Sequence, residues 1–540
     1  MKPSSTKPRA TTNSGWLPMI LHHLKDGDGR RWICYGRASG YVWVEQADFL
    51  ESNVFKRLVR VDPQLLEKVK QRQLIDAVSR ITESQAGVIA LAPGWAGSYF
   101  VPGYFENKGD PAQSAVIAAF EPMQKFRNKG TLGAWQAGIG PYVTKQDLAL
   151  FVLSLALAGA IHPFIPPDYI TPFFELVGDP GKGKTTFGVL AASVWAGDEQ
   201  STTGGGETWN FSPRRIGELK LSHRHMFLLL DEGNLAGQSL DEQAAKVKSV
   251  GFELTDSSQR KVAGEKADAP ESYLTVLSTT NLPIGELLRD REKDQSLNAL
   301  LQRIITIRVP SRPLGVFERL PVGSKHSGDA AEKVRAEIDT NYGSAGQAFT
   351  SEIQRRLRED PARFRASLRR RLERERSRLA EAGAEERIQK AFALVATAGW
   401  LACKSGVLPL AWGKPHKSVR AVAAANRASP KHDAVGLAAV KDYLKRYALD
   451  IVNGDELEEP HLAPDFERIP GYSVTKQQSR WLYVSTEFFQ NNVSCWTEFL
   501  NAAAREGLLH SEGGVQRKRS VKVPRRICVN RRAYCFKISH

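Results

Sequence analysis

The stretch from Phe173 to Leu190, FFELVGDPGKGKTTFGVL, combines residue types that bind phosphate groups. It contains the pattern G-x-x-x-x-G-K-T, which starts at Gly178 and ends at Thr185. Glycines let successive backbone N–H groups turn toward phosphate oxygens, and the positive end of a following helix strengthens the attraction. Lysine brings a charge to the outer phosphates, and the threonine hydroxyl ligates Mg²⁺. The pattern predicts an ATP-binding loop of Gly178, Asp179, Pro180, Gly181, Lys182, Gly183, Lys184, Thr185 and Thr186.

Two adjacent acids, Asp231 and Glu232, follow a second apolar run. The run from Met226 to Leu230 is continuously apolar, which is typical of a strand covered on both faces. In P-loop enzymes an acid at this place holds the magnesium ion, which is the role we predict for Asp231. Glu232 would then act as the general base that polarises the attacking water. The alternative is an acidic pair that caps a helix.

Two more polar residues stand at strand ends. The apolar stretch SYLTVLSTTN ends at Asn281, and the carboxyl edge of an open α/β sheet is where ligands bind. We expect Asn281 to orient the water, although a turn before Pro283 is an alternative. Arg303 precedes a further strand and could reach the nucleotide of a neighbouring subunit as an arginine finger. It could also be a surface cation, and Arg289 and Arg291 are weaker candidates for the finger.

These side chains need strands that alternate with helices, so the predicted fold class is α/β around a P-loop ATPase core. A chain of 540 residues exceeds what one hydrophobic core supports, so several domains are expected. The apolar run Leu148–Ile161 is shorter than the roughly 20 residues that span a bilayer, which favours a buried helix. Five scattered cysteines without a CxxC spacing argue against disulfides and zinc and indicate a cytoplasmic protein.

Several motifs in a fixed order carry a family resemblance. They include GWAGSYFVPGYF, GTLGAWQAGIGPYV, GDPGKGKTT, ETWNFSPRRIGELK, LLLDEGN and NYGSAGQAF. From about residue 85 to about residue 412 the chain resembles the bacterial family catalogued as domain of unknown function 927. Members resemble helicases of mobile elements and prophages, which are AAA+ ATPases related to minichromosome-maintenance and superfamily III helicases. The resemblance implies a hexameric ring that moves on single-stranded DNA, with ATP and Mg²⁺ as cofactors.

Basic residues outside the loop offer candidate DNA contacts. Helicases of the implied class insert a hairpin before the strand that ends at Asn281, and its basic tip would grip the DNA backbone through Arg260, Lys261 and Lys266. An exposed loop that contacts nothing is the alternative. The helical stretch 329–400 mixes arginine and glutamate as i,i+4 pairs do, which indicates a lid and scaffold. Within it, Arg387 is a candidate lid arginine that reaches the nucleotide.

The carboxyl end is strongly basic: the last thirty residues hold nine lysines and arginines, against the single acid Glu512. Its pattern of two helices followed by two strands predicts a winged-helix module on duplex or fork DNA. A basic protein-binding module and a solvated tail are the alternatives. The predicted DNA contacts are Arg517, Lys518, Arg519, Lys522, Arg525 and Arg526.

The expected domains are a flexible tail (1–30), a mixed α+β amino-terminal domain (31–145), an AAA+ core (146–325), a helical lid (326–412), a helical linker (413–475) and the winged helix (476–540). The predicted function is an ATP-dependent DNA helicase or translocase of a mobile element or prophage. Its expected partners are DNA, further copies of the chain and a primase or polymerase. The alternatives are an AAA+ loader or regulatory scaffold that does not unwind DNA, and a packaging or recombination ATPase that binds duplex only.

Overall fold

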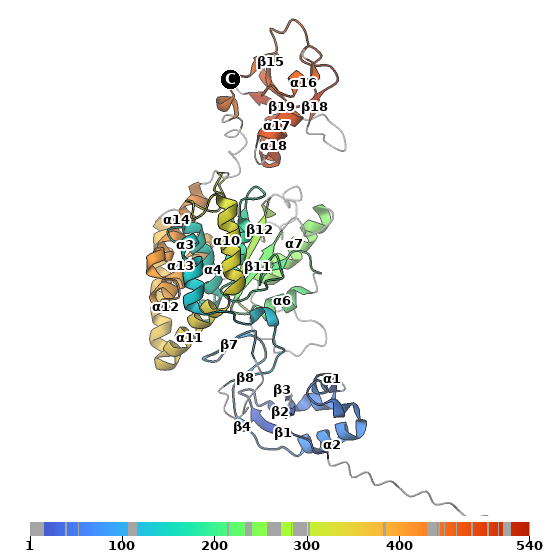
Figure 1. Cartoon of the computed structure of the whole chain (residues 1–540), viewed down its shortest axis with the longest axis vertical. Coiled ribbons are helices and arrows are strands. Elements are labelled where there is room, and N and C mark those ends of the chain that lie inside the picture. The colour runs from blue at the N-terminus through green and yellow to red at the C-terminus, as the bar shows by residue number, and fades with distance from the viewer. Residues whose placement is uncertain are drawn as a thin grey trace, which may run out of the picture.

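The structure is a computed structural model of the whole chain. It describes residues 16–105, 116–232, 240–255, 272–284, 300–428, 440–510 and 520–538, apart from short gaps at 38–39, 52, 170, 213–214, 282, 301–302, 311, 382–384, 441–442, 448, 461, 477–478, 494–495 and 506. Figure 1 shows a central part that carries most of the helices, and a smaller unit at each end of the chain.

The amino-terminal unit is a four-stranded sheet covered by short helices (Figure 1). Its strands, in the spatial order β3-β2-β1-β4, are Gly40–Glu45, Arg31–Arg37, Ile20–Lys25 and Gln85–Ala86. Helices α1 (Val54–Leu58) and α2 (Lys68–Ser79) contribute Leu58 and Leu74 to its core. The expected tail therefore ends before residue 30, because the β1 backbone pairs with β2.

The central part is built around a five-stranded sheet in which every pairing is parallel. Its strands, in the spatial order β10-β11-β12-β9-β13, are Glu207–Thr208, Phe227–Asp231, Thr275–Thr280, Phe173–Val177 and Ile304–Arg308. Strands β9, β11 and β12 are buried along their whole length. This burial explains their continuous apolar runs, since a parallel sheet is covered on both faces.

Helices cover both faces of this sheet (Figure 1). Helices α4 (Asp147–Ile161) and α5 (Lys184–Ala192) share one core with Phe174, Leu229 and Leu277. Helices α6 (Ile216–Ser222) and α7 (Leu240–Thr255) pack on the opposite face. By length and composition, Asp147–Phe164 could cross a membrane, but 89% of this stretch is buried inside the protein. It is the buried helix that the sequence predicts.

The helices after the sheet belong to the same core. They are α10 (Ser327–Thr340), α11 (Ser344–Glu359), α12 (Pro361–Glu381), α13 (Glu386–Lys404) and α14 (Pro415–Ala428). Helix α13 has an almost completely buried stretch from Ala391 to Ala402 and packs on α4 together with α14. The expected lid is therefore a continuation of the central core, because its apolar face covers α4.

The segment before α4 also joins the central part. Here lie β5 (Ile89–Ala90), β6 (Gly94–Ala96), β7 (Tyr99–Val101), β8 (Ile117–Ala118) and α3 (Leu132–Val143). Trp95 Nε1 donates to Ala160 O at 2.8 Å, and Trp135 Nε1 donates to Ser193 Oγ at 3.1 Å. The expected boundary at residue 145 therefore lies too late, because these buried indoles tie residues 94–143 to α4 and α5.

The carboxyl-terminal unit contains a six-stranded sheet. Its strands are β14 (Val452–Asn453), β15 (Tyr472–Lys476), β16 (Ser479–Ser485), β17 (Leu509–His510), β18 (Val521–Lys522) and β19 (Arg532–Ile538). Helices α17 (Thr486–Asn492) and α18 (Trp496–Arg505) are the two helices expected there. The expected linker does not extend to residue 475, since Tyr472 and Val474 are buried on a strand that pairs with β16. The winged-helix assignment stays a prediction.

Candidate functional site

The glycine-rich loop connects β9 to α5 at the carboxyl edge of the central sheet. Gly181 and Gly183 have φ angles of 73° and 82°, a backbone region that side chains other than glycine rarely adopt. A Cβ at position 183 would also stand only 2.8 Å from Val316 Cγ2. The chain therefore needs glycine at position 183 for both conformation and space.

The segment after β13 braces this loop. The Val316 backbone N–H donates to Lys182 O at 2.9 Å, and Lys182 Nζ reaches Arg312 O at 3.5 Å. Glu318 fixes the same segment to the start of α4, because its Oε1 accepts a hydrogen bond from Leu148 N at 3.0 Å. Burial raises the pKa of Glu318. The shape of the loop thus depends on a segment more than 120 residues later in the chain.

Lys184 links the loop to the tip of β12. Its side chain is buried, and its Nζ donates to Gly178 O at 2.7 Å, Asp179 O at 2.8 Å and Asn281 Oδ1 at 3.0 Å. The structure therefore brings two sequence-predicted site residues, Lys184 and Asn281, into direct contact. An ammonium group in this place can move from backbone carbonyls to phosphate oxygens that enter the loop.

Oxygen atoms suited to magnesium lie beside the lysine. Thr185 Oγ1 donates to Asp231 Oδ1 at 3.0 Å. Among the described residues no group of three or more histidine, cysteine, aspartate or glutamate side chains could hold a metal by itself. A threonine hydroxyl and one carboxylate nevertheless fit Mg²⁺, which takes few protein ligands and completes its shell with phosphate oxygens and water. The predicted pair Thr185 and Asp231 thus has the right chemistry and spacing.

Glu232 leaves the end of β11 with an unusual backbone. Its φ angle is 57°, which is uncommon for a residue other than glycine. Its N–H donates to Thr279 Oγ1 at 3.3 Å, and its side chain is exposed next to Asp231. Backbone strain of this kind concentrates at functional sites. The exposed Glu232 carboxylate thus lies at the same sheet edge as Asp231.

Thr279 of this site, and Glu175 within the neighbouring strand β9, carry no motif and were not predicted from the sequence. Thr279 Oγ1 donates to Asp231 Oδ1 and accepts from the N–H of Glu232, so it holds both acids. Glu175 is completely buried in β9 and accepts from Ile284 N at 2.9 Å and from the Thr306 hydroxyl. The available signal was a charged residue inside the apolar run FFELV, since a buried carboxylate must have partners.

A cavity opens above the loop, between it and the start of α10. Its walls are the loop residues 181–186 together with Phe317, Ser327, Gly328, Ala331 and Glu332. A neighbouring hollow shares Thr185, Thr186, Ala331 and Glu332 and continues toward residues 199–202. The two hollows form a continuous space beside the phosphate loop that a nucleotide could occupy.

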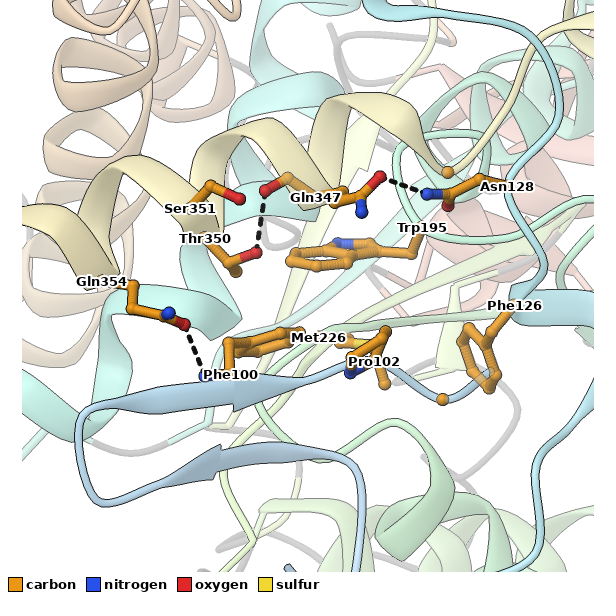
Figure 2. Close-up of a pocket in the computed structure, with 12 residues that line it drawn as sticks. Phe100, Pro102, Phe126, Asn128, Trp195, Met226, Gln347, Thr350, Ser351 and Gln354 are labelled. Atoms are coloured by element: carbon orange, nitrogen blue, oxygen red, sulfur yellow. Dashed lines mark hydrogen bonds between the residues drawn. The ribbon is translucent and has the colours of Figure 1, made fainter. Parts of the chain in front are cut away.

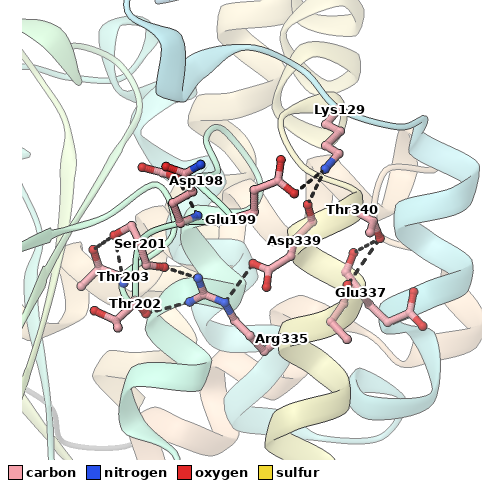
Figure 3. A network of polar contacts seen from close by, with 12 residues as sticks. Lys129, Asp198, Glu199, Ser201, Thr202, Thr203, Arg335, Glu337, Asp339 and Thr340 are labelled. Atoms are coloured by element: carbon pink, nitrogen blue, oxygen red, sulfur yellow. Dashed lines mark hydrogen bonds and ion pairs between the residues drawn. The ribbon is translucent and has the colours of Figure 1, made fainter.

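An ion-pair network closes the far side of this space (Figure 3). Arg335 of α10 donates to Thr202 O at 2.7 Å and to Ser201 O, and it pairs with Asp339 at 2.9 Å. Lys129 pairs with Glu199 at 2.9 Å. These contacts hold the 198–203 segment against α10, and the Arg335 side chain forms part of the cavity wall.

Two predicted arginines do not join the loop. Arg303 stands before β13, at the edge of the sheet opposite the loop, where it donates to Thr255 Oγ1 at 3.2 Å. Arg387 lies on the first turn of α13, and Lys390 one turn later pairs with Asp168 at 2.7 Å. Asp168 lies before the start of β9, and the loop lies after the end of β9. This five-residue strand spans about 13 Å, so Asp168 and the loop lie at opposite edges of the sheet. The start of α13 therefore lies near the beginning of β9, and the lid role of Arg387 stays a prediction.

The predicted DNA contacts divide into two groups. Arg260, Lys261, Lys266, Arg517, Lys518 and Arg519 lie outside the described residues. Lys522, Arg525 and Arg526 are exposed on the carboxyl-terminal unit. Arg526 pairs with Asp455 at 2.7 Å, and nearby Arg531 pairs with Glu467 at 3.1 Å. Acids from residues 455–467 thus neutralise part of the charge that the sequence places at this end.

A second cavity lies between β7 and α11 (Figure 2). The rings of Phe100 and Trp195 stack there with centroids 5.7 Å apart, and Gln354 Oε1 accepts from Phe100 N at 3.1 Å. Asn128 donates to Gln347 on the opposite side. The described residues that line this cavity include no ionisable side chain, so it offers no acid, base or phosphate-binding charge.

Comparisons with known proteins agree with the resemblance found in the sequence. Residues 32–243 match the model of the family described as "Domain of unknown function (DUF927)". The match begins and ends earlier than the stretch 85–412 on which the motifs lie. A solved structure described as "SCCmec type IV Cch - active helicase" superposes with a TM-score of 0.54 at 13% sequence identity, over 97% of this chain and 93% of that one. The two proteins share a mixed α/β fold. No curated protein matches the chain.

Proposed function

We propose that the chain is a magnesium-dependent ATPase of the AAA+ class that drives movement along DNA. The observation that carries the proposal is the contact of three separate segments at one edge of the sheet. Lys184 meets Asn281, and Thr185 meets Asp231, although almost 100 and almost 50 residues separate these partners in the chain. Polar side chains that converge on a glycine-rich loop have the arrangement that phosphate transfer needs.

ATP with its magnesium ion would supply the free energy of γ-phosphate cleavage. Lys184 would exchange its contacts with Gly178 O and Asp179 O for phosphate oxygens, while Asn281 keeps the ammonium in place. Thr185 and Asp231 would hold the ion, with Thr279 orienting the carboxylate. Glu232 would accept the proton of the attacking water.

DNA as the track is supported by the fold and by the family. The chain shares its fold with a protein described as an active helicase over nearly its full length, and its residues 32–243 match the family model. Arg303 stands too far from its own loop to touch the nucleotide there. We therefore propose a ring of identical subunits, a hexamer, in which Arg303 serves the neighbouring site. A mobile element or prophage is the proposed genetic setting.

The deciding measurement is the ATPase rate with and without single-stranded DNA, with rings counted by electron microscopy. We expect stimulation by DNA and closed rings in the presence of nucleotide. Lys184→Ala should abolish both ATP hydrolysis and its stimulation. No hydrolysis by the intact chain would refute the proposal. Stimulated hydrolysis without separation of a forked duplex would favour a loader or scaffold over a helicase.

A further inference from the structure

Helix α12 carries eight arginines within its 21 residues. Four of them, Arg363, Arg370, Arg374 and Arg378, follow each other at intervals of seven, four and four residues. This spacing puts them along one side of the helix. At 1.5 Å per residue the row extends for about 22 Å, with about 6 Å between neighbours four residues apart. The helix therefore presents a straight row of guanidinium groups.

Most of this row lacks a counter-charge. Arg363, Arg370 and Arg374 are exposed and form no ion pair with any carboxylate in the described part of the chain. Arg378 approaches Glu375 at 3.8 Å only, and Glu375 already has closer partners. The i,i+4 pairing expected of residues 329–400 occurs on α10 and α11 and at Arg371 of α12, but not along this row.

The buried flank of the row also has an excess of positive charge. Glu375 is completely buried and pairs with Arg371 of the same helix at 2.7 Å and with Arg420 of α14 at 2.8 Å. One carboxylate therefore faces three guanidinium groups when Arg378 is included. Arg371 is 8% exposed, and its Nη2 is the atom that approaches Glu375, whereas its Nε has no acceptor among the described residues. A buried donor of this kind can bind a further acceptor.

Neighbouring titratable groups respond to this excess. Burial, together with the charges of Arg371, Arg420, Arg378 and Lys417, lowers the pKa of His416 to about 4. Burial also lowers the pKa of Arg371, and the surrounding arginines add to the effect against the opposing influence of Glu375. The surface formed by α12 and the start of α14 thus carries a local field that favours an anion.

We propose that this surface, the row of Arg363, Arg370, Arg374 and Arg378 with Arg371 and Arg420 behind it, binds the phosphate backbone of a DNA strand outside the nucleotide site. The inference rests on the proposed function, which supplies DNA as the partner. A row of charges of one sign suits a chain of phosphates, and arginine forks bind phosphate oxygens in pairs. A protein partner would need an apolar centre. No described residue of α12 or α14 is an exposed large apolar side chain.

The test uses the full chain and a fluorescent oligothymidylate whose anisotropy reports binding across a salt series. The variant Arg370→Gln/Arg374→Gln removes two phosphate contacts. The slope of log affinity against log salt should become shallower by about 1.4, and each lost contact should weaken binding about tenfold at 50 mM salt. The matched control is Arg355→Gln on α11, since Arg355 is exposed but paired with Glu352 and Glu359. The control should change affinity less than twofold.

One further variant and two control measurements separate a lost DNA contact from a structural effect. Arg370→Lys/Arg374→Lys retains both charges and should restore most of the affinity. ATP hydrolysis without DNA and ring size should stay unchanged in the glutamine variant, because α12 lies away from the loop. An unchanged salt slope, or a loss explained by altered ring size, overturns the proposed surface and leaves the ATPase intact. If the unaltered chain binds no DNA at all, the proposed function fails with it.

Discussion

Two polar regions of this molecule differ in what holds them together. At the carboxyl edge of the central sheet, Lys184 contacts Asn281 and Thr185 contacts Asp231, so three segments of the chain meet there. On α12 the arginines follow one another along a single helix, and most form no ion pair with a described carboxylate. At the sheet edge each polar atom has specific hydrogen-bond partners. On α12 the relevant property is the combined positive charge of several arginines.

The comparison shows that the number of charged residues in a segment does not determine the electrostatic potential of its surface. The last thirty residues hold nine lysines and arginines against one acid, yet Arg526 and Arg531 are paired with Asp455 and Glu467 from earlier in the chain. Helix α12 contains acids as well as arginines, yet Glu375 is buried inside the bundle and leaves the exposed row unpaired. Pairing depends on neighbours in space, which the local sequence does not specify.

The largest expected effect on ATP binding and hydrolysis comes from removing the Lys184 ammonium at the sheet edge. Lys184→Ala removes the ammonium that contacts Gly178, Asp179 and Asn281, and it should weaken ATP binding and hydrolysis by about 100-fold or more. Lys182→Ala is the control from the same loop, and its effect should stay within about threefold, because Lys182 only reaches Arg312 O at 3.5 Å. Titration with a fluorescent ATP analogue compares them. If both variants lost ATP affinity equally, binding would depend on the total charge of the loop and not on the position of the Lys184 ammonium.

The second effect separates binding from chemistry at the same edge. Glu232→Gln keeps the shape of the side chain and removes its basicity, so hydrolysis should fall about 100-fold while ATP affinity is retained. Single-turnover hydrolysis and equilibrium binding measure the two quantities. A variant that turns over ATP at the normal rate would remove Glu232 from the mechanism, although its strained backbone would then need another explanation.

The third effect compares the two basic surfaces directly. Arg525→Gln/Arg526→Gln should weaken binding of single-stranded DNA only about threefold at low salt, because Asp455 already neutralises Arg526. Arg370→Gln/Arg374→Gln should have the larger effect. Salt-dependent anisotropy on both variants ranks the surfaces. The opposite order would restore the carboxyl-terminal unit as the main DNA contact.

The smallest expected effect is on stability, and it concerns the contact between the segment before α4 and His225. His225 Nδ1 accepts a hydrogen bond from Trp95 N at 2.9 Å, and burial, with help from Arg224 and His162, lowers the pKa of His225. The folded state then binds fewer protons than the unfolded state, so stability should fall as pH drops below about 6.5, by up to about 1.4 kcal/mol per pH unit. Thermal unfolding between pH 7.5 and 5.5 tests this. His225→Gln should flatten the dependence, and an unchanged slope would assign the effect to other groups.

Much of the central site could be predicted because its residues follow local patterns. Strands β9, β11 and β12 could be predicted from their apolar runs. The glycines and Lys184 follow the first run, and the acids follow the second. Parallel strands bring their carboxyl ends to one edge, so the contact of Lys184 with Asn281 was within reach of sequence reasoning. Thr279 and Glu175 were not, because their importance lies only in what they hold.

The sequence by itself determined the phosphate loop and the order of strands and helices, because these depend on residues that are close along the chain. The tertiary structure decided that α13 begins near Asp168, that the segments around Trp95 and Trp135 belong to the central core, and that several exposed arginines of α12 have no described carboxylate as an ion-pair partner. These outcomes depend on how helices of similar polarity pack against α4 and against one another. Packing of that kind couples residues hundreds of positions apart, so no local pattern encodes it.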